Sequence, residues 1–315
     1  MPLVGDLIRT ALPLPDGKYG NIFVLDPTNG DDTNPGDTFE KPFKTLAAAY
    51  AACVSGQNDV IVYVPGASSI TLSAALDWTK SYTHLVGLCA PTMVGQRCRI
   101  FQLSTLTAAS PLLTISGSGN IFKNLYIFQG VADATSLINV SVTGGRNYFE
   151  NVHFAGGGDT LQAVDGGASL KLDGAEENTF VNCTIGVDTV AAAAGMVGIL
   201  FDGDAHRNLF KNCHVRMLAG HTGAAFVEVA DATGIDRDTI FDNCLFTNTN
   251  AANYTMASAF VIPAISANRP ARIFLKECML YGVTKLDASD RGVLMGNMNA
   301  VTAADLSGVA VQLVV

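Results

Sequence analysis

Two aspartates have the residue type and the spacing to act on a covalent bond. Asp173 and Asp202 lie 29 residues apart, near the same point of two neighbouring copies of a repeat described below. Two carboxylates that flank a scissile bond can serve as general acid and general base in glycoside hydrolysis. Asp204 and His206 follow closely in the sequence. The same residues suit a polar turn between strands, and we expect that structural role, with no catalytic residue.

Residues that could bind a metal occur at two places. His153 and His214 share a repeat position but lie two repeats apart, roughly 10 Å across stacked strands, which is too far for one ion. An acidic loop offers oxygen ligands suited to calcium but lacks the closing glutamate of an EF-hand; it contains Asp26, Asn29, Asp31, Asp32, Asn34 and Asp37. Asx side chains commonly form turn networks, so we predict no metal and no cofactor.

Four tyrosines could stack on sugars. They are Tyr63, Tyr126, Tyr148 and Tyr281. Tyrosine is equally common at protein interfaces, so their presence alone does not separate the two roles.

Six copies of a short pattern organise the chain. They span residues 120–124, 147–151, 178–182, 208–212, 239–243 and 273–277, and their last residues are spaced by 27, 31, 30, 31 and 34. A period of about 30 residues without helical periodicity indicates stacked repeats built from extended strands. Each such repeat contacts only its neighbours, so the chain can lengthen without a larger core.

Three columns of the aligned repeats are apolar and are expected to face inward. Two residues before the last position stand Phe122, Phe149, Phe180, Phe210, Phe241 and Leu275. One residue after it stand Leu125, Val152, Cys183, Cys213, Cys244 and Cys278, and three residues after it stand Ile127, Phe154, Ile185, Val215, Phe246 and Leu280. A column of cysteines reads as small apolar side chains that fill a core slot, and we expect free thiols.

The last position of the pattern marks a bend. Strand side chains alternate with a period of two, and the inward parity changes at this position, so the chain must turn there. Asparagine is the non-glycine residue best able to adopt the left-handed conformation of a one-residue bend. We therefore predict a structural ladder of Asn124, Asn151, Asn182, Asn212 and Asn243. A second asparagine column lies four residues earlier.

A further short strand precedes each pattern. These candidates are 112–115, 137–142, 168–172, 198–201, 225–229 and 259–262. Variable loops rich in Gly, Ala, Thr and Asp separate each pattern from the next such strand. Three short strands for every turn, with two tight bends and one variable loop, describe the coil of a parallel β-helix, so the chain is expected to be all-β.

Charges alternate in sign along two outward columns. One column reads Arg146, Glu177, Arg207, Asp238 and Arg272, and the other includes Lys123, Glu150, Lys211, Asp242 and Lys276. Exposed ion pairs stabilise weakly, but like charges stacked in a slipped register would repel. We expect these charges to lie on adjacent rungs.

The ends of the coil are expected to differ from its middle. An apolar stripe at helical spacing over residues 42–53, with Pro42 in the first turn, predicts a helix that caps the open end of the stack. Val60–Val64 reads as the first strand of the coil. We divide the chain into an N-terminal arm (1–22), a leading strand with a polar loop and capping helix (23–56), the β-helix (57–290) and a C-terminal tail or cap (291–315).

Composition excludes several classes of function. The net charge is −9, and Lys and Arg form no cluster, so the charge of the chain disfavours duplex nucleic acid and anionic membranes as partners. No apolar run is long enough to span a bilayer, and residues 1–20 lack the layout of a secretion signal. Charged residues make up only 15% of the chain, well below about 25% in a typical domain.

The N-terminal segment resembles a known family. Phe23–Asp26, Asn29–Asp32, Asn34–Gly36 and Lys41–Leu46 follow the leading motif of pectin-lyase-like right-handed parallel β-helix proteins, and the asparagine column is similar to that superfamily's asparagine ladder. The resemblance covers about residues 20–285. It implies a right-handed coil, which the chirality of parallel crossovers also favours, with an N-terminal capping α-helix.

The resemblance leaves function open, because the superfamily includes polysaccharide lyases, hydrolases, epimerases and phage virion proteins. In its lyases, acidic and basic groups cluster on the first strand of successive coils. Here those strands offer only Thr114, Asn139, Lys171, Asp202 and Glu228, without a carboxylate row or a companion arginine.

We therefore expect a non-enzymatic bacteriophage virion structural protein, a capsid decoration or cement protein that is assembled in the host cytoplasm and resides in the virion. Its expected partners are other capsid proteins and further copies of itself in a homotrimer. The alternative is a tailspike-like protein that binds or cleaves glycans as a lyase or glycoside hydrolase. A cellular polysaccharide lyase or adhesin is a third hypothesis.

Overall fold

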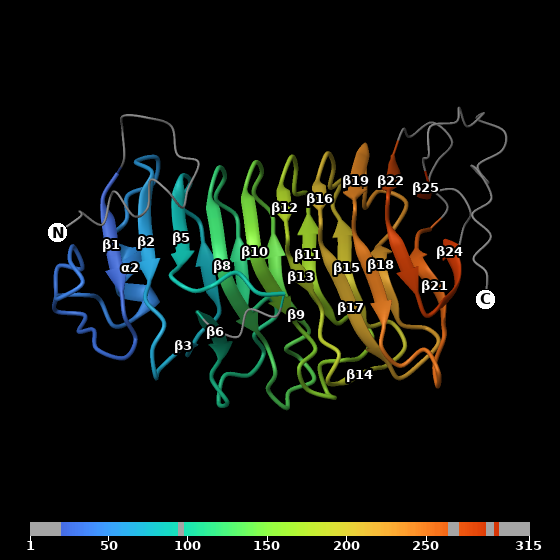
Figure 1. Ribbon diagram of the computed structural model, residues 1–315, viewed down its shortest axis with the longest axis horizontal. Helices are drawn as coiled ribbons and strands as arrows, with labels where there is room; N and C mark the ends of the chain where they lie inside the picture. The colour runs from blue at the N-terminus through green and yellow to red at the C-terminus, as the bar shows by residue number, and fades with distance from the viewer. Residues whose placement is uncertain (1–19, 94–97, 264–270, 288–292, 296–315) are drawn as a thin grey trace.

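The computed structural model describes residues 20–93, 98–263, 271–287 and 293–295, and it confirms an all-β parallel β-helix with one helix (Figure 1). Every ladder between named strands is parallel, and each strand pairs with the equivalent strand of the next coil. The coils form three faces, which we call the first, second and third face in the order in which the chain of each coil visits them. The expected N-terminal arm and C-terminal tail lie largely outside the described residues.

The first face is a sheet of eight strands. They are β4 (Leu76–Trp78), β7 (Leu113–Ile115), β9 (Ile138–Val142), β11 (Ala168–Asp173), β15 (Val197–Asp202), β18 (Ala225–Val229), β21 (Met256–Val261) and β24 (Val283–Asp287). Six of these are the strands that the sequence predicts upstream of each pattern, with bounds shifted by at most three residues.

The second face carries the repeated pattern. Its strands are β1 (Ile22–Leu25), β2 (Asp59–Tyr63), β5 (Thr83–Gly87), β12 (Thr179–Val181), β16 (Leu209–Lys211), β19 (Asp238–Asp242), β22 (Arg272–Lys276) and β25 (Val293–Met295), together with the first halves of β8 (Ile121–Phe128) and β10 (Tyr148–Ala155). β1 pairs with β2, so the stack begins one strand earlier than the expected start at Val60.

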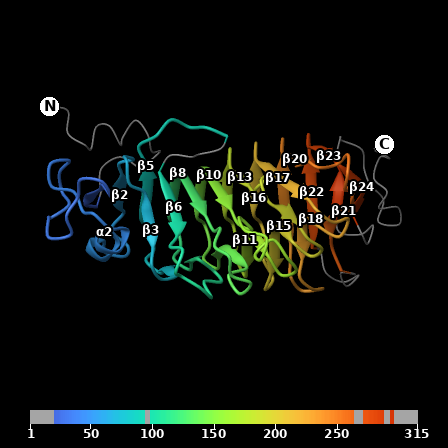
Figure 2. The same ribbon diagram turned by 90° about the horizontal axis from the view of Figure 1, so that it is seen from below.

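The third face follows the bend. It comprises the second halves of β8 and β10 with β3 (Ile70–Leu72), β6 (Arg99–Gln102), β13 (Thr184–Ile185), β17 (His214–Ala219), β20 (Leu245–Asn248) and β23 (Met279–Tyr281). The short β14 (Ala191–Ala192) pairs with the end of β17. Seen from below, the faces enclose a long, narrow core (Figure 2).

Stacked phenylalanines run along the core. The rings of Phe149, Phe180, Phe210 and Phe241 follow one another with centroids 4.7, 4.5 and 4.6 Å apart and nearly parallel planes. Phe122 continues the stack at 5.2 Å. The cysteine column lies beside it, with Cys183, Cys213 and Cys244 buried and Cys278 half-buried. All seven cysteines are free thiols.

The capping helix is shorter than the sequence predicts. It is α2 (Leu46–Ala52), and the hydroxyl of Thr45 caps it by accepting a hydrogen bond from the N–H of Ala48. The expectation that Pro42 lies in the first turn is wrong. Phe43 is extended instead, since its N–H and carbonyl bond the backbone of Val24 and Asp26. The helix seals the core through Tyr50, whose ring lies 4.4 Å from that of Trp78.

The bend at the end of each pattern is left-handed, as the parity change requires. Asn124, Asn151, Asn182, Asn212, Asn243 and Glu277 have φ between 52° and 57°. We call this position the Asn bend and these residues the outer column. Amide–amide bonds of 2.9 Å join Asn151 to Asn124 and Asn243 to Asn212. Because their backbone conformation recurs in each coil, these asparagines set the angle between the second and third faces.

The other asparagine column is more deeply buried and more fully bonded. Its members are Asn120, Asn147, Asn178 and Asn208, and we call it the inner column. The Oδ1 atom of each of the last three accepts a bond from the backbone N–H of the member one coil before it. Side-chain hydrogen bonds to backbone groups on successive coils therefore hold the bend between the first and second faces.

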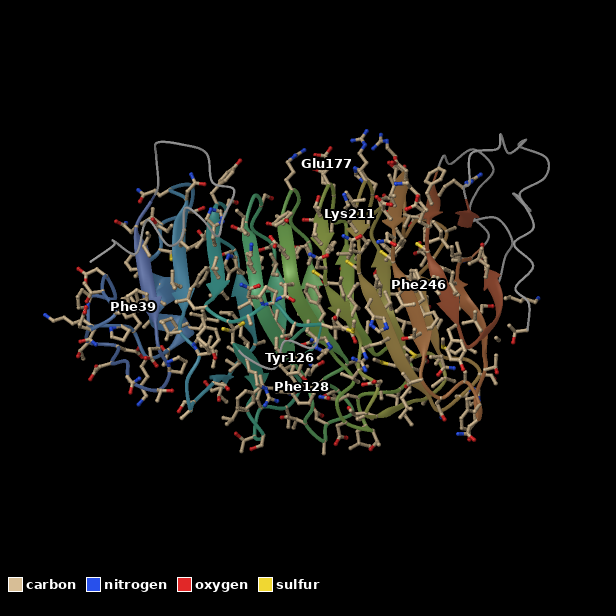
Figure 3. The ribbon with its side chains drawn as sticks, viewed as in Figure 1. Phe39, Tyr126, Phe128, Glu177, Lys211 and Phe246 are labelled. Atoms are coloured by element: carbon tan, nitrogen blue, oxygen red, sulfur yellow. The ribbon has the colours of Figure 1, made fainter. Side chains whose placement is uncertain are left out.

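Charges stack on adjacent rungs, as expected. Glu177 pairs with Arg146 at 2.8 Å and with Arg207 at 3.4 Å. Lys123 pairs with Glu150, and Lys276 pairs with Asp242, both at 3.0 Å. Figure 3 shows Glu177 projecting from the upper rim of the coil. No described helix is long and apolar enough to cross a membrane.

Candidate functional site

The structure brings Asp173 and Asp202 together but ties both to one lysine. They pair in register at the ends of β11 and β15. Nζ of Lys171 lies 2.9 Å from Oδ2 of each carboxylate. Burial opposes the charge of Lys171, but hydrogen bonds and attraction from Asp202 and Asp173 outweigh it and raise the pKa of the ammonium group. The three side chains form a closed ion triad.

Asp204 and His206 take no part in this triad. Asp204 has a left-handed backbone, and its carbonyl lies 2.8 Å from Nδ1 of His206. Nε2 of His206 lies 3.2 Å from a carboxylate oxygen of Glu176. These contacts make a polar turn, which is the structural role expected from the sequence.

The remaining polar candidates on the first face do not converge. Thr114 stacks on Ser141, and Glu228 stacks on Leu200. Asn139 is buried and donates from Nδ2 to the carbonyl of Ile127. Burial, with a contribution from Asp165, raises the pKa of Glu228. Among the described residues, no carboxylate row and no metal-binding cluster of His, Cys, Asp or Glu forms.

The acidic loop near the N-terminus forms a turn network. Asp26 accepts bonds from the N–H groups of Thr28 and Asn29. Asp31 accepts from the N–H and hydroxyl of Thr33. Asp32 accepts from the N–H groups of Lys44 and Thr45 and from the Thr45 hydroxyl. The loop thereby fixes the start of α2.

The strongest candidate for a binding site lies on the third face, where polar and aromatic side chains form a row. Tyr126, His153, Thr184 and His214 follow one another in register and point outward. The ring of Phe128 stacks on that of Tyr126 at 5.8 Å (Figure 3). Arg99 lies over the Tyr126 ring at 5.2 Å. Arg216 forms an ion pair with Asp188.

The two histidines of this row are held by hydrogen bonds. Nε2 of His153 lies 2.9 Å from the carbonyl of Gly186, and Nε2 of His214 lies 2.6 Å from the Thr247 hydroxyl. Burial lowers the pKa of His153 to about 4. The hydrogen bond with Gly186 raises this pKa, and the nearby Arg216 and His214 lower it further. Burial also lowers the pKa of His214. Thr184 separates them by one rung, so they do not share a metal site.

A loop between β5 and β6 reaches over this row. Its described part is Leu88–Met93, which we call the flap, and in Figure 1 it crosses in front of β8 and β10 towards β13. The Thr184 hydroxyl donates a hydrogen bond to the carbonyl of Met93. The flap tip and the Asn bend enclose an open cleft of about 300 Å³, here called the bend cleft; its lining includes Pro91, Met93, Asn151, Asn182, Asn212 and His214.

Sequence reasoning missed this cleft, although the sequence carries its signal. Val86 pairs with Lys123 and Arg99 pairs with Tyr126. Residues 87 and 98 therefore lie against Asn124 and Leu125, and ten extra residues stand where later coils make a one-residue bend.

The four tyrosines considered as sugar platforms are placed differently from one another. Tyr63 is buried, and its hydroxyl donates to the carbonyl of Arg99. Tyr126 is 7% exposed, and Tyr148 donates to Glu150. Tyr281 is 62% exposed on the last coils. The tyrosines do not form one continuous sugar-binding face.

Comparison with solved structures identifies the fold. No family model and no curated protein matches the sequence. Solved structures do match. Pectate lyase Pel9A is 14% identical with a TM-score of 0.54, and the match covers 91% of this chain and 80% of that one. The pectin methylesterase PemA from Erwinia chrysanthemi is 16% identical with a TM-score of 0.58, and the match covers 92% of each chain. The ORF18 protein of Geobacillus virus E2 matches too (14%, 0.54, 84% of this chain and 49% of that one). The fold is a right-handed parallel β-helix.

Proposed function

We propose that this protein is a non-enzymatic virion structural protein of a bacteriophage that decorates the capsid by binding other capsid proteins. The observation that carries the proposal is the ion triad on the first face. A glycoside hydrolase needs its two carboxylates on either side of an open gap that admits the scissile bond. Here Lys171 occupies the position between Asp173 and Asp202.

The rest of the surface supports a binding role. Glu177 and its arginine partners are paired along the coil axis, and only 15% of the residues are charged. A stiff rod with few charged residues can pack against other proteins at a low desolvation cost. A viral protein is among the chains that share the fold. The capsid partners, the homotrimer and the virion location belong to this proposal.

The test uses particles of the virus whose genome carries this sequence. Mass spectrometry of purified virions should detect the protein, and cryo-EM should place a β-helix on the shell. Purified protein should bind shells assembled without it and sediment as a trimer in solution. A monomer that fails to bind such shells would overturn the proposal.

The bend cleft supports a second candidate, a protein that binds or cleaves glycans. Asn151, Asn182 and Asn212 line it beside His214, and amide side chains are among the polar groups that orient a ligand in its site. Two of the solved relatives are named for pectin chemistry.

Incubation with polygalacturonate, methylesterified pectin, bacterial capsule and lipopolysaccharide tests this candidate. Released oligosaccharide or methanol that is lost in Asn182→Ala would favour it over the virion role. Binding without release, again lost in Asn182→Ala, would indicate a glycan-binding tailspike-like protein.

A further inference from the structure

The neck of the flap holds two cysteines at neighbouring positions of the coil. The chain leaves the regular coil after Gly87 and re-enters it at Cys98, and these positions lie against the consecutive residues Asn124 and Leu125. Consecutive Cα atoms are about 3.8 Å apart, so the two ends of the loop are close in space. Cys89 is the second residue of the excursion. The topology therefore brings Cys89 and Cys98 together.

The two sulfur atoms occupy the same small region. Sγ of Cys89 lies 3.4 Å from the carbonyl oxygen of Asn124. A Cβ atom added to Gly87 would lie 2.3 Å from that same oxygen and 2.6 Å from Sγ of Cys98. Gly87 thus leaves the space into which the Cys98 sulfur fits. The two thiols also hydrogen-bond each other, and this contact, followed by burial, raises the pKa of Cys98.

We propose that Cys89 and Cys98 form a reversible disulfide that staples the neck of the flap. The reaction partner is a small disulfide such as oxidised glutathione. Cys89, which is half-buried, is the reachable thiol, whereas Cys98 is 1% exposed. This inference concerns redox chemistry and does not depend on the proposed virion role.

The exchange is balanced in two steps. The thiolate of Cys89 attacks one sulfur of oxidised glutathione, forms a mixed disulfide and releases one glutathione thiolate. That thiolate takes the proton of Cys98, whose sulfur then attacks Sγ of Cys89 and releases the second glutathione. Two protein thiols are oxidised and one glutathione disulfide is reduced to two thiols. A reducing compartment keeps the pair open, and an oxidising medium closes it.

The bond would act on the bend cleft. The flap tip forms one wall of the cleft and accepts a hydrogen bond from Thr184 at Met93. A disulfide at the neck ties the flap more closely to the rigid coil. The flap wall of the cleft is therefore less free to move when the two cysteines are bonded than when they are reduced.

The other cysteines provide an internal comparison. Cys213 and Cys244 are adjacent in the core column, and the backbone N–H of Cys213 lies 3.4 Å from Sγ of Cys244. Both are at most 2% exposed, so a reagent in solution does not reach them while the protein is folded. Cys278 is half-buried at the far end of the column. The flap neck should therefore react before the buried pair of Cys213 and Cys244.

The experiment treats the folded, full-length protein with oxidised glutathione, blocks remaining thiols by alkylation and digests it with trypsin without reduction. Mass spectrometry should find the peptide Ser81–Arg97 joined to the dipeptide Cys98–Arg99, and dithiothreitol should release it. The link should be absent in Cys89→Ser and retained in Cys278→Ser, which removes a half-buried thiol elsewhere. Oxidised wild type should also unfold at a higher temperature than reduced wild type.

Two results would overturn the inference. One is a stable glutathione adduct at Cys89 without the joined peptides, which would show that Cys98 cannot reach it. The other is a link between Cys213 and Cys244 that forms as fast as the link at the flap neck, which would remove its selectivity.

Discussion

The backbone N–H of Asn147 donates a 2.9 Å hydrogen bond to Oδ1 of Asn178, one coil further along the chain. Nδ2 of Asn178 donates in turn to the carbonyl of Gly144 and to Oδ1 of Asn208. Each inner-column asparagine thus supplies hydrogen-bond partners to backbone groups of a buried bend, where the hydrogen bonds between strands are interrupted. Backbone groups buried without partners cost about 1–3 kcal/mol each, so this column is a main source of order in the coil.

The two asparagine columns should respond differently to the same substitution. Asn178→Ala leaves buried groups of Asn147 and Gly144 without partners and should lower the free energy of unfolding by about 2–4 kcal/mol. Asn182→Ala, four residues later, loses mainly the left-handed preference of an exposed bend with φ 53°, worth about 1 kcal/mol. Denaturant unfolding of both variants measures the difference. Equal losses would contradict the assigned roles.

The phenylalanine stack should be the most sensitive part of the core. Phe180 is fully buried between Phe149 and Phe210, so Phe180→Ala should cost about 3–5 kcal/mol through lost burial and a cavity. Phe39 is 41% exposed (Figure 3), and Phe39→Ala should cost much less. Thermal and urea unfolding give the comparison. A mild effect at Phe180 would show that neighbouring coils collapse into the gap.

The charge column should favour the correct register only weakly. Glu177→Lys places three cations on adjacent rungs beside Arg146 and Arg207, and the variant should lose up to about 1 kcal/mol at low salt. Salt should reduce the loss, because it screens exposed charges. Glu40→Lys, an equally large charge change in the exposed N-terminal loop, serves as the control. Urea titrations at low and high sodium chloride separate the two, and a loss at Glu177 that salt leaves unchanged would refute the electrostatic explanation.

Much of the coil could be predicted because the same types of side chain recur at equivalent positions of each coil. Phe149 and Phe180 lie in register because the core slot recurs once in each coil, and Asn151 bends the chain because few residues tolerate its φ of 52°. The same reasoning did not predict which asparagine column is the more deeply buried, because burial depends on how the first and second faces meet. Arg146, Glu177 and Arg207 are also left-handed, which their residue types do not indicate.

The candidate site was harder to predict. The flap is a single insertion, and its direction depends on contacts such as that between Thr184 and Met93, which no repeat encodes. Spacing brought Asp173 and Asp202 together correctly. Spacing could not reveal that Lys171 lies between them, because a long lysine side chain can reach several carboxylates and the sequence does not say which. Pro42 was misplaced because Asp32 and Thr45 supply the helix start from residues far apart in the chain.

Two buried histidines should make the fold sensitive to mild acid. Burial lowers the pKa of both His84 and His153 from the ordinary 6.5 to about 4. Nδ1 of His84 accepts a hydrogen bond from the N–H of Ile121, which requires that this nitrogen carry no proton. Between pH 6.5 and 4 the unfolded chain binds protons that the folded chain does not bind, so stability rises with pH across this window and falls on acidification.

The size of the effect follows from the shift. At pH 5.0 each histidine should lower the free energy of unfolding by about 2 kcal/mol relative to pH 7.5, at about 1.4 kcal/mol for each pH unit below 6.5. His153→Gln should remove about half of the combined loss, because glutamine keeps a donor for the Gly186 carbonyl but does not titrate. His221→Gln, at an exposed histidine, should leave the loss intact. Urea unfolding of the three proteins at both pH values tests this, and an undiminished loss in His153→Gln would show that other groups control the acid sensitivity.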